Sequence, residues 1–285
     1  MKKILFVLLI LSIMITSCGK KENPFYSEYD TAFGVPPFDE IKNEHFEPAF
    51  VKGMEEQNEE IEAIINNSEE PTFANTIEAI EYSGSLLDKV SGVFYNFNSC
   101  LIDDEISEIA KNMAPKMSAH SDNIWLNTDL FERVKKVHDK KDELDLGQEE
   151  MMLLTETHKR FVRNGAALPE EKRERLKEIN SKLSSLTLEF GQNVMKEVNS
   201  YTLVIDNEED LSGLSKSVIN NAAEKAKEEE LEGKWVFTLQ NPSVMPFLHK
   251  ADNRELRKKM QQAYINRGNN DNEFDNKKII GEIVS

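Results

Sequence analysis

Apolar residues recur at steps of three and four along most of this chain, which is the spacing of helices that pack one face against a core. The longest run follows Pro169, and its apolar positions are Leu176, Ile179, Leu183, Leu186, Phe190, Val194 and Val198. Proline followed by two glutamates is typical of a first helical turn, because proline lacks the N–H that would be unpaired there and acids complement the helix dipole. The pattern therefore predicts a mainly α-helical chain whose longest helix begins near residue 170.

The same periodicity predicts a series of further helices. They cover residues 46–65, 77–101, 104–117, 130–137, 148–163 and 215–229, and one more begins after Asp252 or Asn253. Pro71 and Thr72 separate the first two of these helices. Asp104 is the predicted N-cap of the third, because a short acidic side chain can accept hydrogen bonds from the free N–H groups of a first turn.

Two stretches favour β structure instead. Residues 201–205 read Tyr-Thr-Leu-Val-Ile, and residues 234–240 begin Lys-Trp-Val-Phe-Thr-Leu. Both are rich in the β-branched and aromatic residues that strands prefer. We predict that they pair as a small two-stranded β element within the helical chain.

The composition is consistent with a soluble, helix-rich protein. Of the 285 residues, 39% are hydrophobic and 31% are charged, and the formal net charge is −17. A surface this acidic repels phosphate backbones, so no nucleic-acid partner is expected. Helices rich in glutamate produce the same charge in many proteins, and the charge by itself therefore indicates no particular partner.

The start of the chain resembles the leader of a bacterial lipoprotein. Two lysines precede an apolar run, residues 4–15, that is too short for a comfortable membrane span. The run ends at Ile-Thr-Ser-Cys, where Cys18 has the place of the lipidated cysteine of a lipobox. We predict a signal peptide at 1–17, a tether at 18–43, and export to the periplasmic or cell-surface side of a bacterial membrane through a lipid anchor at Cys18. The alternative is an ordinary secretory leader with an incidental cysteine.

Local catalytic motifs are missing from the sequence. A zinc hydrolase of the HExxH type needs two histidines four residues apart on a helix, and none of the five histidines has such a neighbour. No Gly-x-Ser-x-Gly nucleophile motif occurs. Cys100 lies in an apolar helical pattern, where a buried and inert thiol is expected. The residues alone therefore assign no catalytic and no metal-binding position.

Several short motifs nevertheless occur together in one order. They are Pro37-Phe38-Asp39-Glu40-Ile41-Lys42, His45-Phe46-Glu47-Pro48-Ala49-Phe50, Pro71-Thr72-Phe73-Ala74-Asn75-Thr76-Ile77, Ala114-Pro115-Lys116 with His120, Phe161-Val162-Arg163-Asn164-Gly165-Ala166, Gly233-Lys234-Trp235-Val236-Phe237-Thr238-Leu239, and Pro242-Ser243 with Pro246-Phe247-Leu248. From Asn23 to the end, the chain resembles the thimet oligopeptidase family of zinc metallopeptidases. Within that family it is most similar to the bacterial peptidyl-dipeptidases, also called dipeptidyl carboxypeptidases.

The resemblance implies an almost wholly helical, two-lobed metallopeptidase with a deep channel between the lobes. In the family, zinc is held in the channel by an HExxH helix and a later glutamate, and a zinc-bound water attacks the peptide carbonyl. The narrow channel restricts substrates to short peptides, and the peptidyl-dipeptidase branch releases dipeptides from their C-terminal ends.

The zinc motif of the family lies beyond the residues matched here, so no family catalytic or zinc residue is carried over to this sequence. We predict an N-terminal helical domain at 44–240 and the start of a truncated catalytic domain at 241–285. A helix that opens an apolar face after Asn276 and stops at Ser285 favours truncation. This chain alone is expected to bind no zinc and to be inactive. The alternative function is a non-catalytic helical lipoprotein that binds peptides or a partner protein.

Overall fold

The structure is a computed structural model that describes residues 22–100 and 103–285. It divides into two compact units, residues 1–178 and 179–285, and the division falls within helix α8 (Glu170–Ser200). Helices make up most of both units, and the described residues form one two-stranded sheet. The predicted fold class, mainly α with a small β element, is therefore confirmed. The predicted domain boundary at 240/241 stays a prediction.

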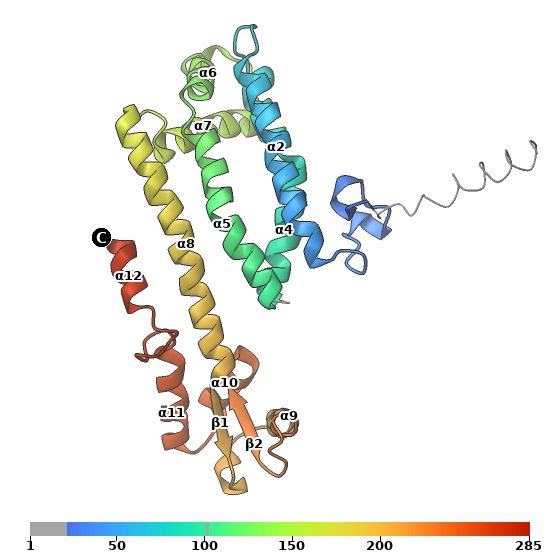
Figure 1. Cartoon of the computed structure of the whole chain (residues 1–285), viewed down its shortest axis with the longest axis vertical. Coiled ribbons are helices and arrows are strands. Elements are labelled where there is room, and N and C mark those ends of the chain that lie inside the picture. The colour runs from blue at the N-terminus through green and yellow to red at the C-terminus, as the bar shows by residue number, and fades with distance from the viewer. Residues whose placement is uncertain (1–21, 101–102) are drawn as a thin grey trace, which may run out of the picture. The chain divides into compact units, whose positions relative to one another are not determined.

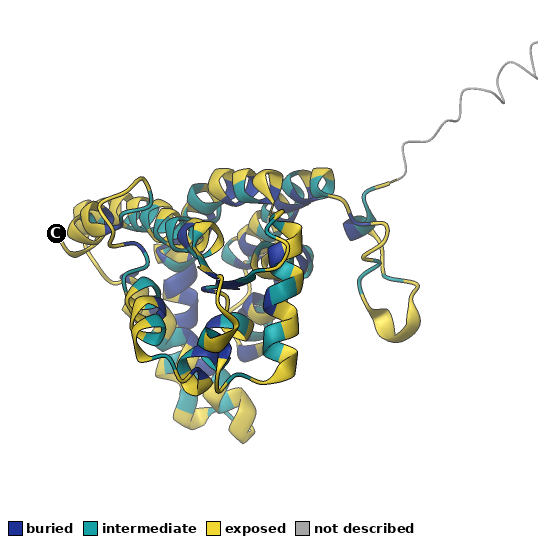
Figure 2. Ribbon diagram, turned by 90° about the horizontal axis from the view of Figure 1, so that it is seen from below, coloured by how far each residue is buried: buried dark blue, intermediate teal, exposed yellow. Residues whose placement is uncertain are grey.

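The first unit consists of helices that pack through their apolar faces. They are α2 (Phe46–Ile65), α3 (Ala79–Tyr82), α4 (Ser85–Cys100), α5 (Asp104–Trp125), α6 (Thr128–Asp139), α7 (Gln148–Asn164) and the start of α8. Helix α2 packs against α4 and α5, and α6 packs against α7 (Figure 1). Buried positions lie on one side of these helices and exposed positions on the other (Figure 2). The helical periodicity of the sequence therefore corresponds to real packing faces.

The helix predicted over residues 77–101 is interrupted at Ser83 and Gly84, so that prediction was wrong near its start. Ser83 is extended (φ −71°, ψ 146°), and Gly84 has φ +81°, in the left-handed region that favours glycine. A Cβ at position 84 would meet the end of the Gln57 side chain on α2, so a larger residue there would have to displace that amide. The break lets the Gln57 amide donate to the Ser83 carbonyl oxygen (3.3 Å).

Two further predictions around the start of α5 were wrong. Asp103, rather than Asp104, is the N-cap, because its backbone is extended (φ −124°, ψ 179°) and its carboxylate accepts from the Ile106 N–H (2.7 Å). Cys100 is exposed rather than buried. The buried residues of α4 end at Phe94, and Cys100 is the last residue of the helix, beyond the part that packs on α2.

Aromatic rings and one glycine join α2 to α4. Phe46 and Phe50 of α2 each pack edge-to-face on Phe94, with ring centroids 5.2 Å apart in both pairs. One turn beyond Phe50, Gly53 lies directly on the backbone of α4: a Cβ at position 53 would lie 2.9 Å from N and Cα of Leu87. The absence of a side chain at Gly53 therefore permits close approach of the two helices.

The second unit packs helices around the sheet. Its elements are the rest of α8, β1 (Thr202–Ile205), α9 (Lys216–Glu228), β2 (Trp235–Thr238), α10 (Asn241–Lys250), α11 (Arg254–Ile265) and α12 (Lys277–Val284). The strands are antiparallel, with Thr202 opposite Thr238, which confirms the predicted pairing of 201–205 with 234–240. Phe237 of β2 packs on Phe247 of α10, with centroids 4.6 Å apart, and α9 packs on β2. The core of this unit therefore lies against the sheet.

The loop from α11 to α12 is anchored on one buried carboxylate. Glu197 of α8, which is 6% exposed, accepts hydrogen bonds from the Gly268 N–H, from Nδ2 of Asn270 (2.7 Å) and from Nδ2 of Asn272 (2.8 Å). Burial acts to raise the pKa of Glu197, but these three donors outweigh it and lower the pKa below the usual value of 4.5. Glu197 is therefore a charged group that holds the loop in place.

Candidate functional site

The described residues hold no cluster that would bind a metal ion. Among residues 22–100 and 103–285, no group of three or more His, Cys, Asp or Glu side chains is placed to hold a metal ion. The expectation that this chain carries no zinc or catalytic residue stays a prediction. Cys18, the predicted lipidation site, lies outside the described residues. Within those residues no helix combines the length and the apolar character that a membrane span requires.

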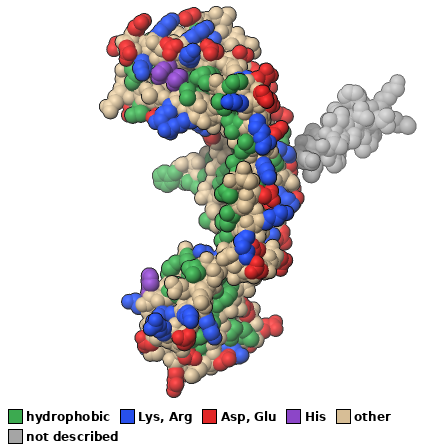
Figure 3. All heavy atoms as spheres, turned by 90° about the vertical axis from the view of Figure 1, so that its left-hand side faces the viewer, with side chains coloured by type: hydrophobic (Ala, Val, Ile, Leu, Met, Phe, Trp, Pro, Cys, Tyr) green, Lys and Arg blue, Asp and Glu red, His purple; other side chains and the backbone are tan. Residues whose placement is uncertain are grey.

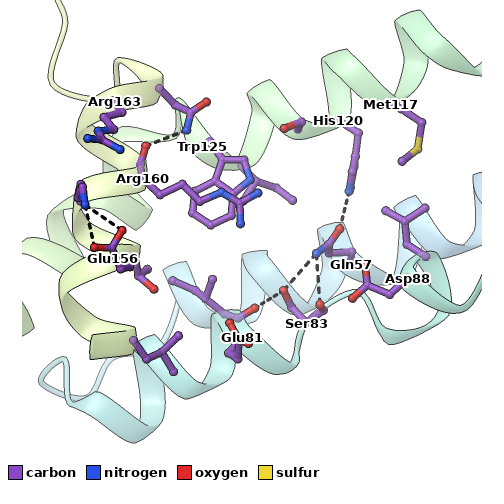
Figure 4. A pocket seen from close by; sticks show the side chains of 18 residues that line it. Gln57, Glu81, Ser83, Asp88, Met117, His120, Trp125, Glu156, Arg160 and Arg163 are labelled. Carbon is purple, nitrogen blue, oxygen red and sulfur yellow. Dashed lines mark hydrogen bonds and ion pairs between the residues drawn. The ribbon is translucent and has the colours of Figure 1, made fainter. Parts of the chain in front are cut away.

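The first unit contains a cavity of about 700 Å³ among α2, α3, α4, α5 and α7 (Figure 4). Its inner surface includes three buried polar residues, Ser83, His120 and Thr157. Its rim carries exposed charged residues from α3, α4 and α7. A volume of this size lies within the range of about 300–1,000 Å³ that is typical of small-molecule sites.

A hydrogen-bonded chain from three segments fixes the floor of the cavity. Gln57 donates through Nε2 to the carbonyl oxygen and to Oγ of Ser83 (3.3 Å each), and Oγ of Ser83 donates to the Ile80 carbonyl oxygen (2.8 Å). The Gln57 Oε1 atom then faces Nε2 of His120 at 2.7 Å. Since Oε1 can only accept, His120 carries its proton on Nε2. Burial lowers the pKa of His120, which favours this neutral form.

Helix α7 supplies a positively charged side. This side of the cavity is lined by three basic residues of α7, namely Lys159, Arg160 and Arg163. The Arg160 guanidinium lies 3.7 Å from the ring centroid of Trp125, a cation–π contact visible in Figure 4. Lys159 is paired with Glu156, at 2.8 and 3.1 Å from its two carboxylate oxygens. Arg163 has no hydrogen-bond or ion-pair partner for its guanidinium in the described part of the chain.

Helices α3 and α4 supply carboxylates to the same cavity. Glu81 comes from α3 and Asp88 from the first turn of α4 (Figure 4). Neither carboxylate forms an ion pair at hydrogen-bonding distance with any residue in the described ranges. Burial lowers the pKa of Arg160, whereas the charge of Glu81 raises it, so the two groups act on each other. The cavity is therefore bipolar, with guanidinium groups on one side and carboxylates on another.

Sequence reasoning did not find this cavity, although one signal was present. The motif Phe161-Val162-Arg163-Asn164-Gly165-Ala166 forms the end of α7, where Gly165 (φ +98°) ends the helix in the left-handed conformation. Two residues of that motif, Arg163 and Asn164, line the cavity. The available signal was the group of three basic residues on one helix, Lys159, Arg160 and Arg163. The other residues that line the cavity come from helices distant in the sequence.

A second histidine feature lies between α6 and α7. The imidazole rings of His138 and His158 stack with centroids 3.9 Å apart and an interplanar angle of 8°, and Figure 3 shows an adjoining pair of histidine side chains on one face. Burial lowers the pKa of both rings, and the charge of His138 lowers that of His158 further. The closest carboxylate, that of Asp139, is 4.0 Å from His138. Two stacked neutral rings are a packing arrangement, and they do not complete a ligand set for a metal ion.

No family model matches the chain, but several known proteins are similar to it. The chain is 34% identical over 262 residues to dipeptidyl carboxypeptidase of Escherichia coli (strain K12), a match covering 92% of the chain and 38% of that protein, and the same values hold for dipeptidyl carboxypeptidase of Salmonella typhimurium. It is 27% identical over 259 residues to oligopeptidase A of Escherichia coli (strain K12), covering 90% of the chain and 38% of that protein. The chain thus spans less than two fifths of the length of these peptidases.

Proposed function

From the premise that this chain belongs to the thimet oligopeptidase family, as the N-terminal part of such a protein, we propose that the whole protein is a zinc metallopeptidase that releases dipeptides from the C-terminal ends of short peptides. The observation that carries this proposal is the identity of 34% with a dipeptidyl carboxypeptidase over 92% of the chain. The identity with oligopeptidase A is lower, at 27%. The dipeptidyl branch is therefore preferred over the oligopeptidase branch.

The contribution of this chain to that activity is structural. In the proposed enzyme, zinc activates the water that attacks the peptide bond. The residues described here offer no cluster that fits a zinc ion, so no catalytic step is assigned to them. The helices of the first unit form a rigid wall, in which aromatic packing and the Gly53 contact hold α2 against α4. Such a wall restricts access and limits substrates to short, unfolded peptides.

The test is cleavage of a short N-blocked peptide by a longer protein that contains this chain, with products separated by chromatography. We expect C-terminal dipeptides, loss of activity on zinc chelation, recovery on adding zinc, and no cleavage of the same peptide with an amidated C-terminus. The 285-residue chain alone should release no dipeptide and bind no stoichiometric zinc. Dipeptide release by that chain, or single amino acids as the product of the longer protein, would contradict the proposal.

The proposed location is the outer side of a bacterial membrane, with a lipid on Cys18. The support is the sequence itself: two lysines, an apolar run at 4–15, and a cysteine directly after it. In cells fed a labelled fatty acid, Cys18→Ser should abolish labelling and move the protein to the soluble fraction. Cys100→Ser is the matched control and should keep the label, although Cys100 is exposed. Retention of the label in Cys18→Ser would refute the anchor.

A further inference from the structure

The bipolar cavity of the first unit contains charges that the protein itself leaves unpaired. Arg163 has no partner within residues 22–100 and 103–285, and Arg160 rests on the Trp125 ring without an ion pair at hydrogen-bonding distance. Glu81 and Asp88 are likewise without such a pair. By contrast, Lys159, on the same helix, already has Glu156 as its partner. Four charged groups thus face one cavity and remain available to a ligand.

We propose that this cavity binds a short peptide with both termini free, with its carboxylate at Arg160 and Arg163 and its ammonium group at Glu81 and Asp88. A ligand that carries one charge of each sign satisfies both sides of the cavity, whereas a simple anion or cation satisfies only one. The choice of a peptide among such ligands rests on the proposed function, which makes short peptides the substrates and products of the protein.

The chemistry of each side suits its proposed partner. A guanidinium group presents a planar fork of N–H donors that matches a carboxylate, and Trp125 restricts Arg160 before any ligand arrives. A primary ammonium group donates in several directions, so it needs only carboxylates nearby. The floor between them is mixed, with Ile124 and Leu153 as apolar surface beside the Gln57–His120 pair. Apolar side chains of a peptide therefore have surface to cover.

The size of the cavity limits the ligand to a few residues. An extended peptide spans at most about 3.3–3.6 Å per residue, and the cavity volume is about 700 Å³. The charged groups are exposed to solvent, which weakens each ion pair. We therefore expect dissociation constants of about 0.1–1 mM, and alanine peptides of two to four residues are suitable probes.

Binding can be followed through Trp125 in a Trp235→Phe background, because the chain has two tryptophans and the other lies in the second unit. At least one alanine peptide of two to four residues should change the Trp125 emission saturably, with heat of binding in calorimetry as a second readout. The C-terminal amide of that peptide should bind the parent protein at least tenfold more weakly than the free peptide does. The Arg163→Gln variant should bind the free peptide at least tenfold more weakly than the parent protein does. The Arg163→Gln variant should lose no further affinity toward the amide.

The opposite end is tested in the same way. Glu81→Gln should weaken binding of the free peptide but not of its N-acetyl form. Lys111→Gln is the matched control, because Lys111 is exposed on α5 and does not line the cavity, and it should stay within twofold of the parent. Circular dichroism melts of every variant should coincide, so that altered binding is not a loss of fold.

Several outcomes would overturn the proposal. These are no binding in either readout, undiminished binding by Arg163→Gln, and binding of acetate as tight as that of the peptides, which would indicate an anion site only. Because no cleavage is measured, the result is independent of the peptidase assay. If the protein binds peptides but cleaves none, the cavity assignment stands and the proposed function is refuted. If it releases dipeptides but the cavity binds no peptide, the proposed function stands and the cavity assignment is refuted.

Discussion

Replacing Phe161 with alanine should destabilise the first unit by about 3–5 kcal/mol, the usual cost of deleting a buried aromatic ring. Phe161 of α7 is 0% exposed, and its ring lies 4.8 Å from that of Trp125 and 5.8 Å from that of Phe131. Removing the ring therefore takes away contacts to both α5 and α6 and leaves a cavity that close-packed neighbours cannot fill. The change should appear in urea unfolding followed through tryptophan fluorescence.

The neighbouring residue provides the control. Val162 is 46% exposed, so Val162→Ala should change the free energy of unfolding by no more than about 0.5 kcal/mol. Because Trp125 also supports Arg160, Phe161→Ala should in addition alter Trp125 emission in the folded state. A loss of less than about 1 kcal/mol in Phe161→Ala would show that the ring contacts at the α5–α6–α7 junction do not hold the unit together.

Replacing Glu197 with glutamine should destabilise the second unit by about 2–4 kcal/mol at neutral pH. The buried negative charge that accepts three hydrogen bonds is then gone, so these bonds are lost or weakened. In addition, the amide N–H groups of the new glutamine would point at the N–H donors of the loop. The loop over residues 266–276 depends on this carboxylate through Gly268, Asn270 and Asn272. Amide hydrogen exchange should therefore rise first in that loop.

The pH dependence of this effect has a definite sign. The pKa of Glu197 is lower in the folded chain than the usual value of 4.5. Its stabilising contribution is therefore complete above about pH 4.5 and is lost as the pH falls through the folded-state pKa. The stability difference between the parent and Glu197→Gln should be constant from pH 7 to pH 5 and shrink below that.

Glu189→Gln is the matched control for this experiment. Glu189 lies on the same helix, is exposed, and has no ion-pair or hydrogen-bond partner for its carboxylate among the described residues. Its replacement should change stability by about 0.5 kcal/mol or less at every pH. An equal effect of the two substitutions would mean that Glu197 acts only as one more surface charge.

Most elements of the fold could be predicted from local pattern alone. The apolar spacing after Pro169 predicted the longest helix, and α8 extends over 31 residues. The strands at 201–205 and 234–240 were recognisable because β-branched and aromatic residues are concentrated there. Asn253 was one of two predicted caps, and its side chain accepts from the N–H groups of Glu255 and Leu256 (3.0 and 3.1 Å). These features depend on residues a few positions apart, which periodicity captures.

The missed helix break and the missed cavity both involve residues that are distant in the sequence. Gly84 lies inside a regular apolar pattern, and a single glycine is tolerated within helices. At the break, the side chain of Gln57, from another element, occupies the space where a Cβ on residue 84 would lie. The cavity was missed for the same reason, because Gln57, Glu81, His120 and Arg160 lie on different helices. Sequence spacing describes one helix at a time and contains no information on which charged residues meet across several.

The contact between Gly53 and Leu87 has a consequence for variation in this protein. Leu87 of α4 also lines the cavity, and so does Gln57, which lies one helical turn from Gly53 on α2. The contact between Gly53 and Leu87 therefore sets the distance between the α2 wall and the α4 wall of the cavity. A methyl group at position 53 would push α2 and α4 apart and so displace both walls of the cavity. Natural variants with alanine or serine at this position should therefore carry a compensating change on α4 near Leu87.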